Sequence, residues 1–206
     1  MFFRNFDKIK SRTESDACKE LENVKAKIIE GEKVKKERYP STLILFIVGH
    51  CNEAGNLVLP DKSILKKKTM YNFIRDVNMK SVIVLCNGYY SEKLVKHLSK
   101  SNFVFSPNAF FGVYSHSGNL CKISHKNVCN KHSVTVRYIL DILKKDEVSF
   151  NQCPSNSRTH LTIRDLIQLV SKRMSDECGR CLKPIERNGA GRIPLAYTYK
   201  KSLSYI

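Results

Sequence analysis

Two long apolar runs stand out in the pattern of hydrophobic and polar positions, at residues 42–48 and 81–85. Both are rich in β-branched residues, and continuous apolar runs of this length are typical of parallel strands covered on both faces. Shorter apolar segments predict further strands at residues 103–105 and 111–114, and the pattern of residues 193–206 is also strand-like. The chain therefore predicts a sheet whose strands are spread along its length.

Helical spacing of apolar residues separates these strands. Thr13 and Asp16 predict a capping box before the first helix, and Thr162 and Asp165 predict a second one before the last helix. Thr69 is expected to cap another helix between the two long strands. The inner face of that helix is predicted to hold Met70, Phe73, Ile74 and Val77.

Two more helices are predicted by apolar spacing within residues 94–98 and 134–143, whereas residues 115–133 and 146–160 have the composition of polar loops. The alternation of strands and helices predicts one domain over residues 1–206. Its expected fold class is α/β, with three layers (α/β/α) and a mostly parallel central sheet.

The chain is strongly basic, with 36 Lys and Arg against 19 Asp and Glu and a net charge of +17. Such an excess attracts acidic partners in general, including nucleic acid, because binding to phosphates releases counterions. The basic residues are scattered, however, with short runs at residues 33–36 and 66–68 that are typical of solvated helix faces. Direct nucleic-acid binding is therefore not the favoured interpretation.

The sequence predicts neither a membrane segment nor a secretory signal. No apolar stretch reaches the roughly 18 residues that a membrane span needs, and Arg4 interrupts the apolar start of the chain. Eight cysteines in a lysine-rich chain of this kind favour reduced thiols over a disulfide framework. The expected location is the cytoplasm.

A histidine and a cysteine follow the two strongest predicted strands, as His50 and Cys86. Because ligands bind beyond the carboxyl ends of parallel strands, we expect the two side chains to lie side by side there, open to solvent. A thiolate attacks carbonyl groups, and an imidazole can accept the thiol proton and return it. Turns at Gly49 and Gly88 can supply amide donors for an oxyanion. A core cysteine and a hydrogen-bonded histidine are the alternative interpretation.

Two further groups of residues have spacings that metal sites use. Four potential ligands lie within one short segment, namely Cys121, His125, Cys129 and His132. This donor set suits tetrahedral zinc, but its spacing matches no common zinc finger, and a polar loop is the alternative. Cys178 and Cys181 form a CxxC pair, for which free thiols are expected. No cofactor is predicted.

The two strand ends resemble those of a known enzyme family. An apolar strand ending in Gly49-His50, followed by one ending in Cys86-Asn87-Gly88, is similar to the caspase-like cysteine peptidases, which include caspases, paracaspases and metacaspases. Residues 162–173 resemble the family's penultimate helix and residues 193–205 its final strand, so the similarity covers nearly the whole chain. It implies the caspase-like fold without a clear counterpart of the family's first strand. The implied large-subunit-like and small-subunit-like parts are residues 1–112 and 113–206.

The resemblance also implies a role for individual residues. His50 would be the general base and Cys86 the nucleophile of an endopeptidase, and the amide of Cys86 with one near Gly49 or Cys51 would form the oxyanion hole. The residues implied for substrate binding are Val84, Tyr114, Ser115 and His116. The implied setting is regulated proteolysis in apoptosis. Its partners would be protein or peptide substrates, and a homodimer or a heterodimer with a caspase-like protein.

Several positions depart from the family's pattern. Cys51 stands where the family usually has glycine, so a side chain can obstruct the oxyanion donor. Val84 and His116 differ from the caspase residues at those positions, and residues 77–140 contain no aspartate for self-cleavage between subunits. A divergent peptidase of other specificity and a catalytically inactive regulator that binds a caspase or its adaptor both fit these departures. A third interpretation is a basic zinc-containing nucleic-acid-binding protein built on residues 121–132.

Overall fold

The chain forms two compact units in a computed structural model. The model describes residues 11–34, 42–88, 90–100, 109–116, 139, 162–178 and 181–192. The larger unit comprises residues 7–116 and 184–190, and the smaller unit comprises residues 1–6, 117–183 and 191–206. Both residues of the expected dyad, His50 and Cys86, belong to the larger unit.

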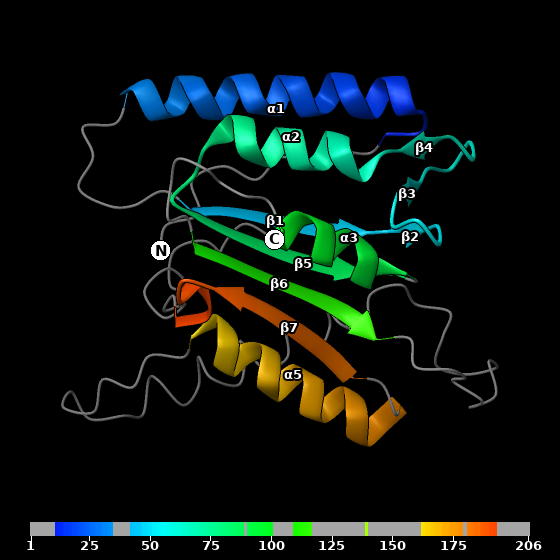
Figure 1. The fold of residues 1–206 in the computed structure, drawn as a ribbon, viewed down its shortest axis with the longest axis vertical. Helices are drawn as coiled ribbons and strands as arrows, with labels where there is room; N and C mark the ends of the chain where they lie inside the picture. Colours follow the sequence, from blue (N-terminus) through cyan, green and yellow to red (C-terminus); the bar gives the residue numbers. More distant parts are fainter. Residues whose placement is uncertain are drawn as a thin grey trace, which may run out of the picture. The chain divides into compact units, whose positions relative to one another are not determined.

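The larger unit is built on a sheet with the strand order β1-β5-β6-β7 (Figure 1). The strands are β1 (Thr42–Val48), β5 (Ser81–Asn87), β6 (Ala109–His116) and β7 (Cys181–Arg187), the last of which has its second half in this unit. β1 and β5 are parallel with Ile44 opposite Ile83, and β5 and β6 are parallel with Val84 opposite Gly112. The fold is therefore mixed α/β with a mostly parallel sheet, as the β-branched runs predict.

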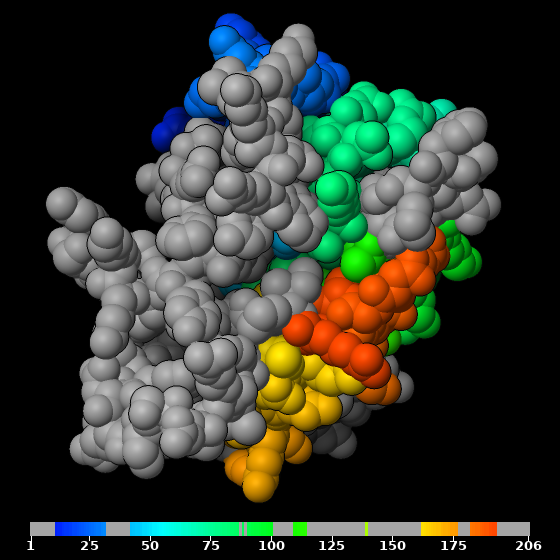
Figure 2. All heavy atoms as spheres, turned by 90° about the vertical axis from the view of Figure 1, so that its left-hand side faces the viewer, coloured from blue at the N-terminus to red at the C-terminus, as the bar shows by residue number. Residues whose placement is uncertain are grey.

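Helices of the larger unit pack on one another and on this sheet. They are α1 (Glu14–Val34), α2 (Lys67–Val77) and α3 (Ser91–Ser99). α1 packs on α2, α2 on α3, and α3 on β5 and β6, and α1 and α2 adjoin in both views (Figures 1 and 2). Gly112 of β6 lets α3 approach, because a Cβ atom there would lie 2.5 Å from Cγ1 of Val95.

The core between the sheet and these helices is apolar and closely packed. Alternate residues of β5 face it, because successive side chains of a strand point to opposite faces. These residues are Val82, Val84 and Cys86. Val82, Val84 and Leu94 are fully buried, and burying one aliphatic side chain contributes about 1.5–3 kcal/mol. Cys86 is thus part of the hydrophobic core.

A small antiparallel sheet follows directly after β1. Its strands are β2 (His50–Cys51), β3 (Leu57–Val58) and β4 (Ile64–Leu65). Oδ1 of Asn52 holds the first turn, because it accepts the N–H groups of Ala54 and Asn56 at 3.1 and 3.0 Å. Gly55 has φ +82, and a Cβ atom there would lie 2.8 Å from Cβ of Lys93 in α3. Contacts with this turn and with β2 hold the small sheet on α3.

The smaller unit contains α5 (Ile163–Cys178), which begins at the predicted capping box. The Thr162 amide and hydroxyl donate to Oδ2 of Asp165 at 3.0 and 2.6 Å, and the Asp165 amide donates to Oγ1 of Thr162 at 3.2 Å. Oγ of Ser171 accepts the Leu182 amide at 3.0 Å and donates to the Leu182 carbonyl at 3.2 Å. These bonds tie the first residues of β7 to α5. A short 3-10 helix, Ala190–Arg192, follows β7.

Most local predictions within the described residues are confirmed. β1, β5 and β6 contain the predicted strands, and α2 buries its four predicted inner residues. The prediction that Thr69 caps α2 is wrong. The helix begins at Lys67, and its N-cap is Lys66 with an extended backbone and no side-chain cap. The predicted loop after β6 begins later than expected, since Ser115 and His116 still belong to the strand.

Other predictions fall on residues that the structure does not describe. These are the strands at 103–105 and 193–206, and the helix at 134–143 apart from residue 139. Among the helices that are described, none combines the length and the apolar composition needed to cross a bilayer.

Candidate active site

The carboxyl ends of β1 and β5 lie side by side. Because the two strands are parallel and Val48 is opposite Asn87, the chain leaves both of them at the same edge of the sheet. His50 follows the end of β1, and Cys86 is the residue before the end of β5. The topology thus brings the backbones of the expected dyad to one sheet edge, where α/β sheets bind ligands.

Two glycines hold these strand ends against each other. A Cβ atom on Gly88 would overlap the carbonyl oxygen of Gly49 and would lie 3.6 Å from the amide nitrogen of His50. A clash with a backbone oxygen cannot be relieved by a side-chain rotation, so only glycine permits this approach. The segment that carries His50 is therefore in direct contact with the residues that follow Cys86.

The two residues of β2 have opposite environments. His50 pairs with Val58 and is exposed, whereas Cys51 pairs with Leu57 and is only 4% exposed. Consecutive residues of a strand point to opposite sides, so Cys51 is the residue of β2 that faces the core. Cys51 belongs to the same apolar cluster as Cys86.

Cys86 is buried and interacts with a second thiol. Its side chain is 3% exposed, so the expectation of a solvent-open sulfur is wrong, because the alternation of β5 turns this side chain into the core. The hydrogen bond with the Cys51 thiol and then burial raise the pKa of Cys86 well above its ordinary value. The same bond lowers the pKa of Cys51. Of the two thiols, Cys51 therefore has the lowered pKa and Cys86 the raised one.

A buried hydroxyl completes the surroundings of the Cys86 sulfur. Ser91, the first residue of α3, is fully buried. It acts on the Cys86 thiol as a donor and lowers its pKa, against the larger effects of Cys51 and burial. The contact lacks the geometry of a regular hydrogen bond, and among the described residues the Ser91 hydroxyl has no other partner. A hydroxyl that donates toward the sulfur can stabilise a thiolate at Cys86.

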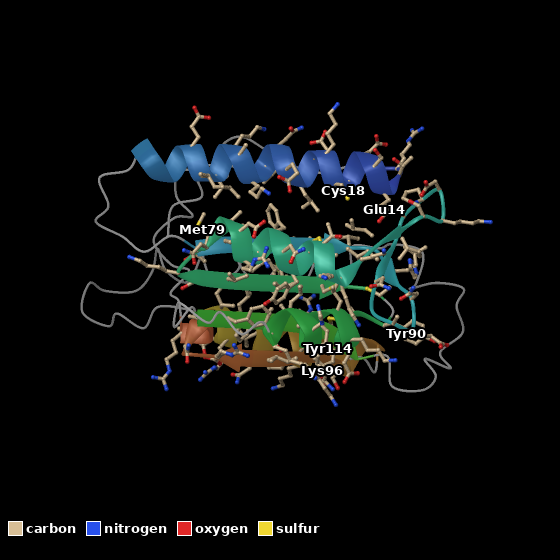
Figure 3. All side chains as sticks on the ribbon, turned by 45° about the horizontal axis from the view of Figure 1, so that its top comes forward. Glu14, Cys18, Met79, Tyr90, Lys96 and Tyr114 are labelled. Carbon is tan, nitrogen blue, oxygen red and sulfur yellow. The ribbon has the colours of Figure 1, made fainter. Side chains whose placement is uncertain are left out.

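The residues expected to bind substrate have different environments. Val84 is fully buried in the core cluster, where its side chain packs against protein. Tyr114 lies opposite Cys86 on the neighbouring strand and is 6% exposed. Figure 3 shows Tyr114 near Lys96 of α3, and the tyrosine helps to raise the pKa of that lysine, after the larger effect of Glu92. Ser115 and His116 are the last residues of β6.

The expected zinc ligands lie outside the described residues, as residues 121–132 are not part of them. Of the CxxC pair, Cys178 ends α5 and Cys181 begins β7. Within the part of the chain that the structure describes, no group of three His, Cys, Asp or Glu side chains is arranged to hold a metal ion. The zinc-dependent nucleic-acid interpretation therefore stays a prediction from sequence.

Comparison with known proteins does not assign the chain to a family. No protein-family model matches the chain, and no curated protein sequence matches it. The functional argument therefore depends on the chain's own residues and on how the sheet arranges them.

The structure adds Cys51 and Ser91 to the residues singled out by sequence. Both surround the Cys86 sulfur, although neither was expected to contact it. The inward orientation of Cys51 follows from the two-residue strand β2, which the apolar pattern did not predict. No sequence signal existed for Ser91 either, since its burial depends on the packing of α3 against β5.

Proposed function

We propose that the chain is a caspase-like cysteine endopeptidase domain in which Cys86 is the nucleophile and His50 the general base. The observation that carries this proposal is the parallel pairing of β1 with β5, together with the contact between Gly49 and Gly88. It sets the backbones of His50 and Cys86 at adjacent strand ends, with the imidazole on the exposed side of β2 and the thiol in the core cluster. The resemblance of the same two strand ends to the caspase-like family supports this assignment.

The proposed reaction starts from a protonated thiol, because the pKa of Cys86 is raised. A protonated thiol is a poor nucleophile, so its proton must be removed as the carbonyl carbon is attacked. In the proposed mechanism His50 accepts this proton and then transfers it to the leaving amine, while Cys86 carries the acyl group. Water hydrolyses the acyl-enzyme in a second step, again with His50 as the base.

An oxyanion forms in both steps and needs amide donors. The amide of Cys86 is one candidate, and the segment held against Gly88 supplies the other, from Gly49 or Cys51. Because the contact at Gly88 is between backbones, the donors of this segment are positioned independently of side-chain rotamers. The side chain of Cys51 points into the core cluster, away from the exposed side of β2. This orientation is compatible with an oxyanion site that the Cys51 side chain does not obstruct.

A second candidate function is a catalytically inactive regulator of the same fold. The observation that favours it is the environment of Cys86, which is 3% exposed in the core and has a raised pKa because of the Cys51 thiol and burial. Buried structural cysteines of this kind are inert. Such a regulator would bind a caspase-like protein with equal affinity whether residue 86 is cysteine or alanine.

Peptide hydrolysis separates the two candidates. The full chain is incubated with a mixed peptide library, and cleaved bonds are identified by mass spectrometry. We expect cleavage that disappears in Cys86→Ala and in His50→Ala but persists in Cys18→Ala, a matched control for a partly exposed thiol on α1. Undiminished cleavage by Cys86→Ala contradicts the proposal, and so does a folded wild-type chain that cleaves no peptide.

Thiol labelling provides an independent measurement. Exposure alone predicts that iodoacetamide modifies Cys18 faster than Cys86, since Cys18 is partly exposed and Cys86 is buried. A functional dyad reverses this order, and His50→Ala then slows the labelling of Cys86 while leaving that of Cys18 unchanged. Labelling of Cys86 that is slow and insensitive to His50→Ala supports the inactive regulator.

A further inference from the structure

The two buried thiols at the sheet edge, those of Cys51 and Cys86, can also be oxidised. We propose that Cys51 and Cys86 form a reversible disulfide when the chain meets hydrogen peroxide. The disulfide itself does not depend on the proposed peptidase function. Its consequence does rest on that function, because a disulfide at Cys86 removes the nucleophile and switches hydrolysis off.

The placement of the two side chains favours a bond between them. Both cysteines are reduced and face the same apolar cluster, and each thiol shifts the pKa of the other. The contact of Gly49 with Gly88 keeps the two backbone segments close together. A disulfide needs a sulfur–sulfur distance of about 2.05 Å and adjacent Cα atoms.

Cys51 is the thiol that reacts first. Its pKa is the lowered one of the pair, and the thiolate is the reactive form of a cysteine. Its sulfur attacks one oxygen of hydrogen peroxide, so the O–O bond breaks, the sulfenic acid of Cys51 forms, and hydroxide leaves. The proton that Cys51 gave up converts this hydroxide to water.

Cys86 resolves the sulfenic acid. Its sulfur attacks the sulfur of Cys51, the S–O bond breaks, and the hydroxide leaves as water with the Cys86 proton. In total the two thiols lose two electrons and two protons, and one peroxide is reduced to two waters. A small dithiol such as dithiothreitol reverses the change by thiol–disulfide exchange and is itself oxidised to its cyclic disulfide.

Burial restricts this pair to a small oxidant. Cys51 and Cys86 are 4% and 3% exposed, so a bulky oxidised thiol such as glutathione disulfide reaches them less readily than hydrogen peroxide does. The neighbouring Cys86 thiol also intercepts the sulfenic acid before a second peroxide arrives. Cys18 makes a matched comparison, because it is partly exposed on α1 and is also reduced.

Peptide mapping tests the proposal on the full chain. The reduced protein is treated with hydrogen peroxide, its remaining thiols are alkylated, and the digest is analysed by mass spectrometry with and without dithiothreitol. We expect a peptide pair joined through Cys51 and Cys86 that disappears on reduction. The linked pair should also form in Cys18→Ser and be absent from Cys51→Ser. Oxidation of Cys51 to sulfinic acid without the linked pair overturns the proposal, and so does an unreacted pair under conditions that oxidise Cys18.

The same samples separate this proposal from the peptidase proposal. If the linked pair forms and no peptide is cleaved in either redox state, the disulfide holds and the peptidase function fails. If the reduced chain cleaves peptides and the linked pair never forms, the disulfide fails alone. If both hold, peroxide abolishes cleavage and dithiothreitol restores it.

Discussion

Replacing Gly88 with alanine tests the contact that holds the two strand ends together. The new Cβ atom would overlap the Gly49 carbonyl oxygen and approach the His50 amide nitrogen to 3.6 Å. Because the obstructing atoms belong to the backbone, the segment from Gly49 must move away from β5. Overpacking of this kind destabilises a protein by about 1–3 kcal/mol. The alanine also stiffens the unfolded chain, which offsets about 0.4–1 kcal/mol of that loss.

Gly31→Ala is the matched control for this substitution. Gly31 lies within α1, and a Cβ atom there would meet no atom within 4 Å. Alanine is favoured over glycine inside a helix by about 0.5–1 kcal/mol, so this variant should be more stable than the wild type. The two variants make the same chemical change and are expected to shift stability in opposite directions.

Urea unfolding followed by circular dichroism measures the difference, with the free energy taken from the midpoint and slope. Thermal unfolding should agree, since about 2–4 °C of Tm corresponds to each kcal/mol in a chain of this size. Gly88→Ala should also slow peptide cleavage, because the His50 segment moves relative to Cys86. A Gly88→Ala protein as stable as Gly31→Ala would refute the reasoning that these backbones are in contact.

Two other predictions use hydrogen bonds that the structure defines. Thr162→Ala removes the cap of α5 and should lower the free energy of unfolding by about 0.5–2 kcal/mol in urea titrations. A variant as stable as the wild type would contradict the capping box. The bonds from Thr162 also lower the pKa of Asp165, so they stabilise the fold above the ordinary carboxyl pKa. This stabilisation is lost as pH falls through the lowered value, and Thr162→Ala should flatten that part of the stability–pH curve. Cys51→Ala removes the largest cause of the raised Cys86 pKa. The pH profile of Cys86 alkylation should therefore move to lower pH in this variant and stay unchanged in the control Cys18→Ala. A profile that does not move in Cys51→Ala would argue against the interaction of the two thiols.

Local patterns in the sequence were sufficient to predict the main elements of the fold. The runs at β1 and β5 are continuous and rich in β-branched residues, and such runs favour strands wherever they occur. The inner face of α2 follows from helical spacing alone. The capping box of Thr162 and Asp165 is also local, because its hydrogen bonds join residues three positions apart.

β7 is a strand that local sequence patterns do not predict. Its residues include Lys183, Pro184, Glu186 and Arg187, a composition with little preference for a strand. Among the strands that the structure describes, it is the last in the order of the sheet, where it lies beside β6. Edge positions tolerate proline and charged side chains, since one side of the strand needs no partner.

The candidate site also has one part that the sequence predicted and another that only the tertiary structure decided. Sequence alone predicted a histidine and a cysteine at the ends of two parallel strands, because strand ends can be recognised from the apolar pattern. His50 does follow β1, whereas Cys86 is the residue before the last in β5. Only the tertiary structure decided which side chain the Cys86 thiol meets. That choice depends on the register of β1 with β5, on the alternation that turns Cys51 inward, and on the packing of α3. These are contacts between residues far apart in the chain, and no local pattern encodes their distances.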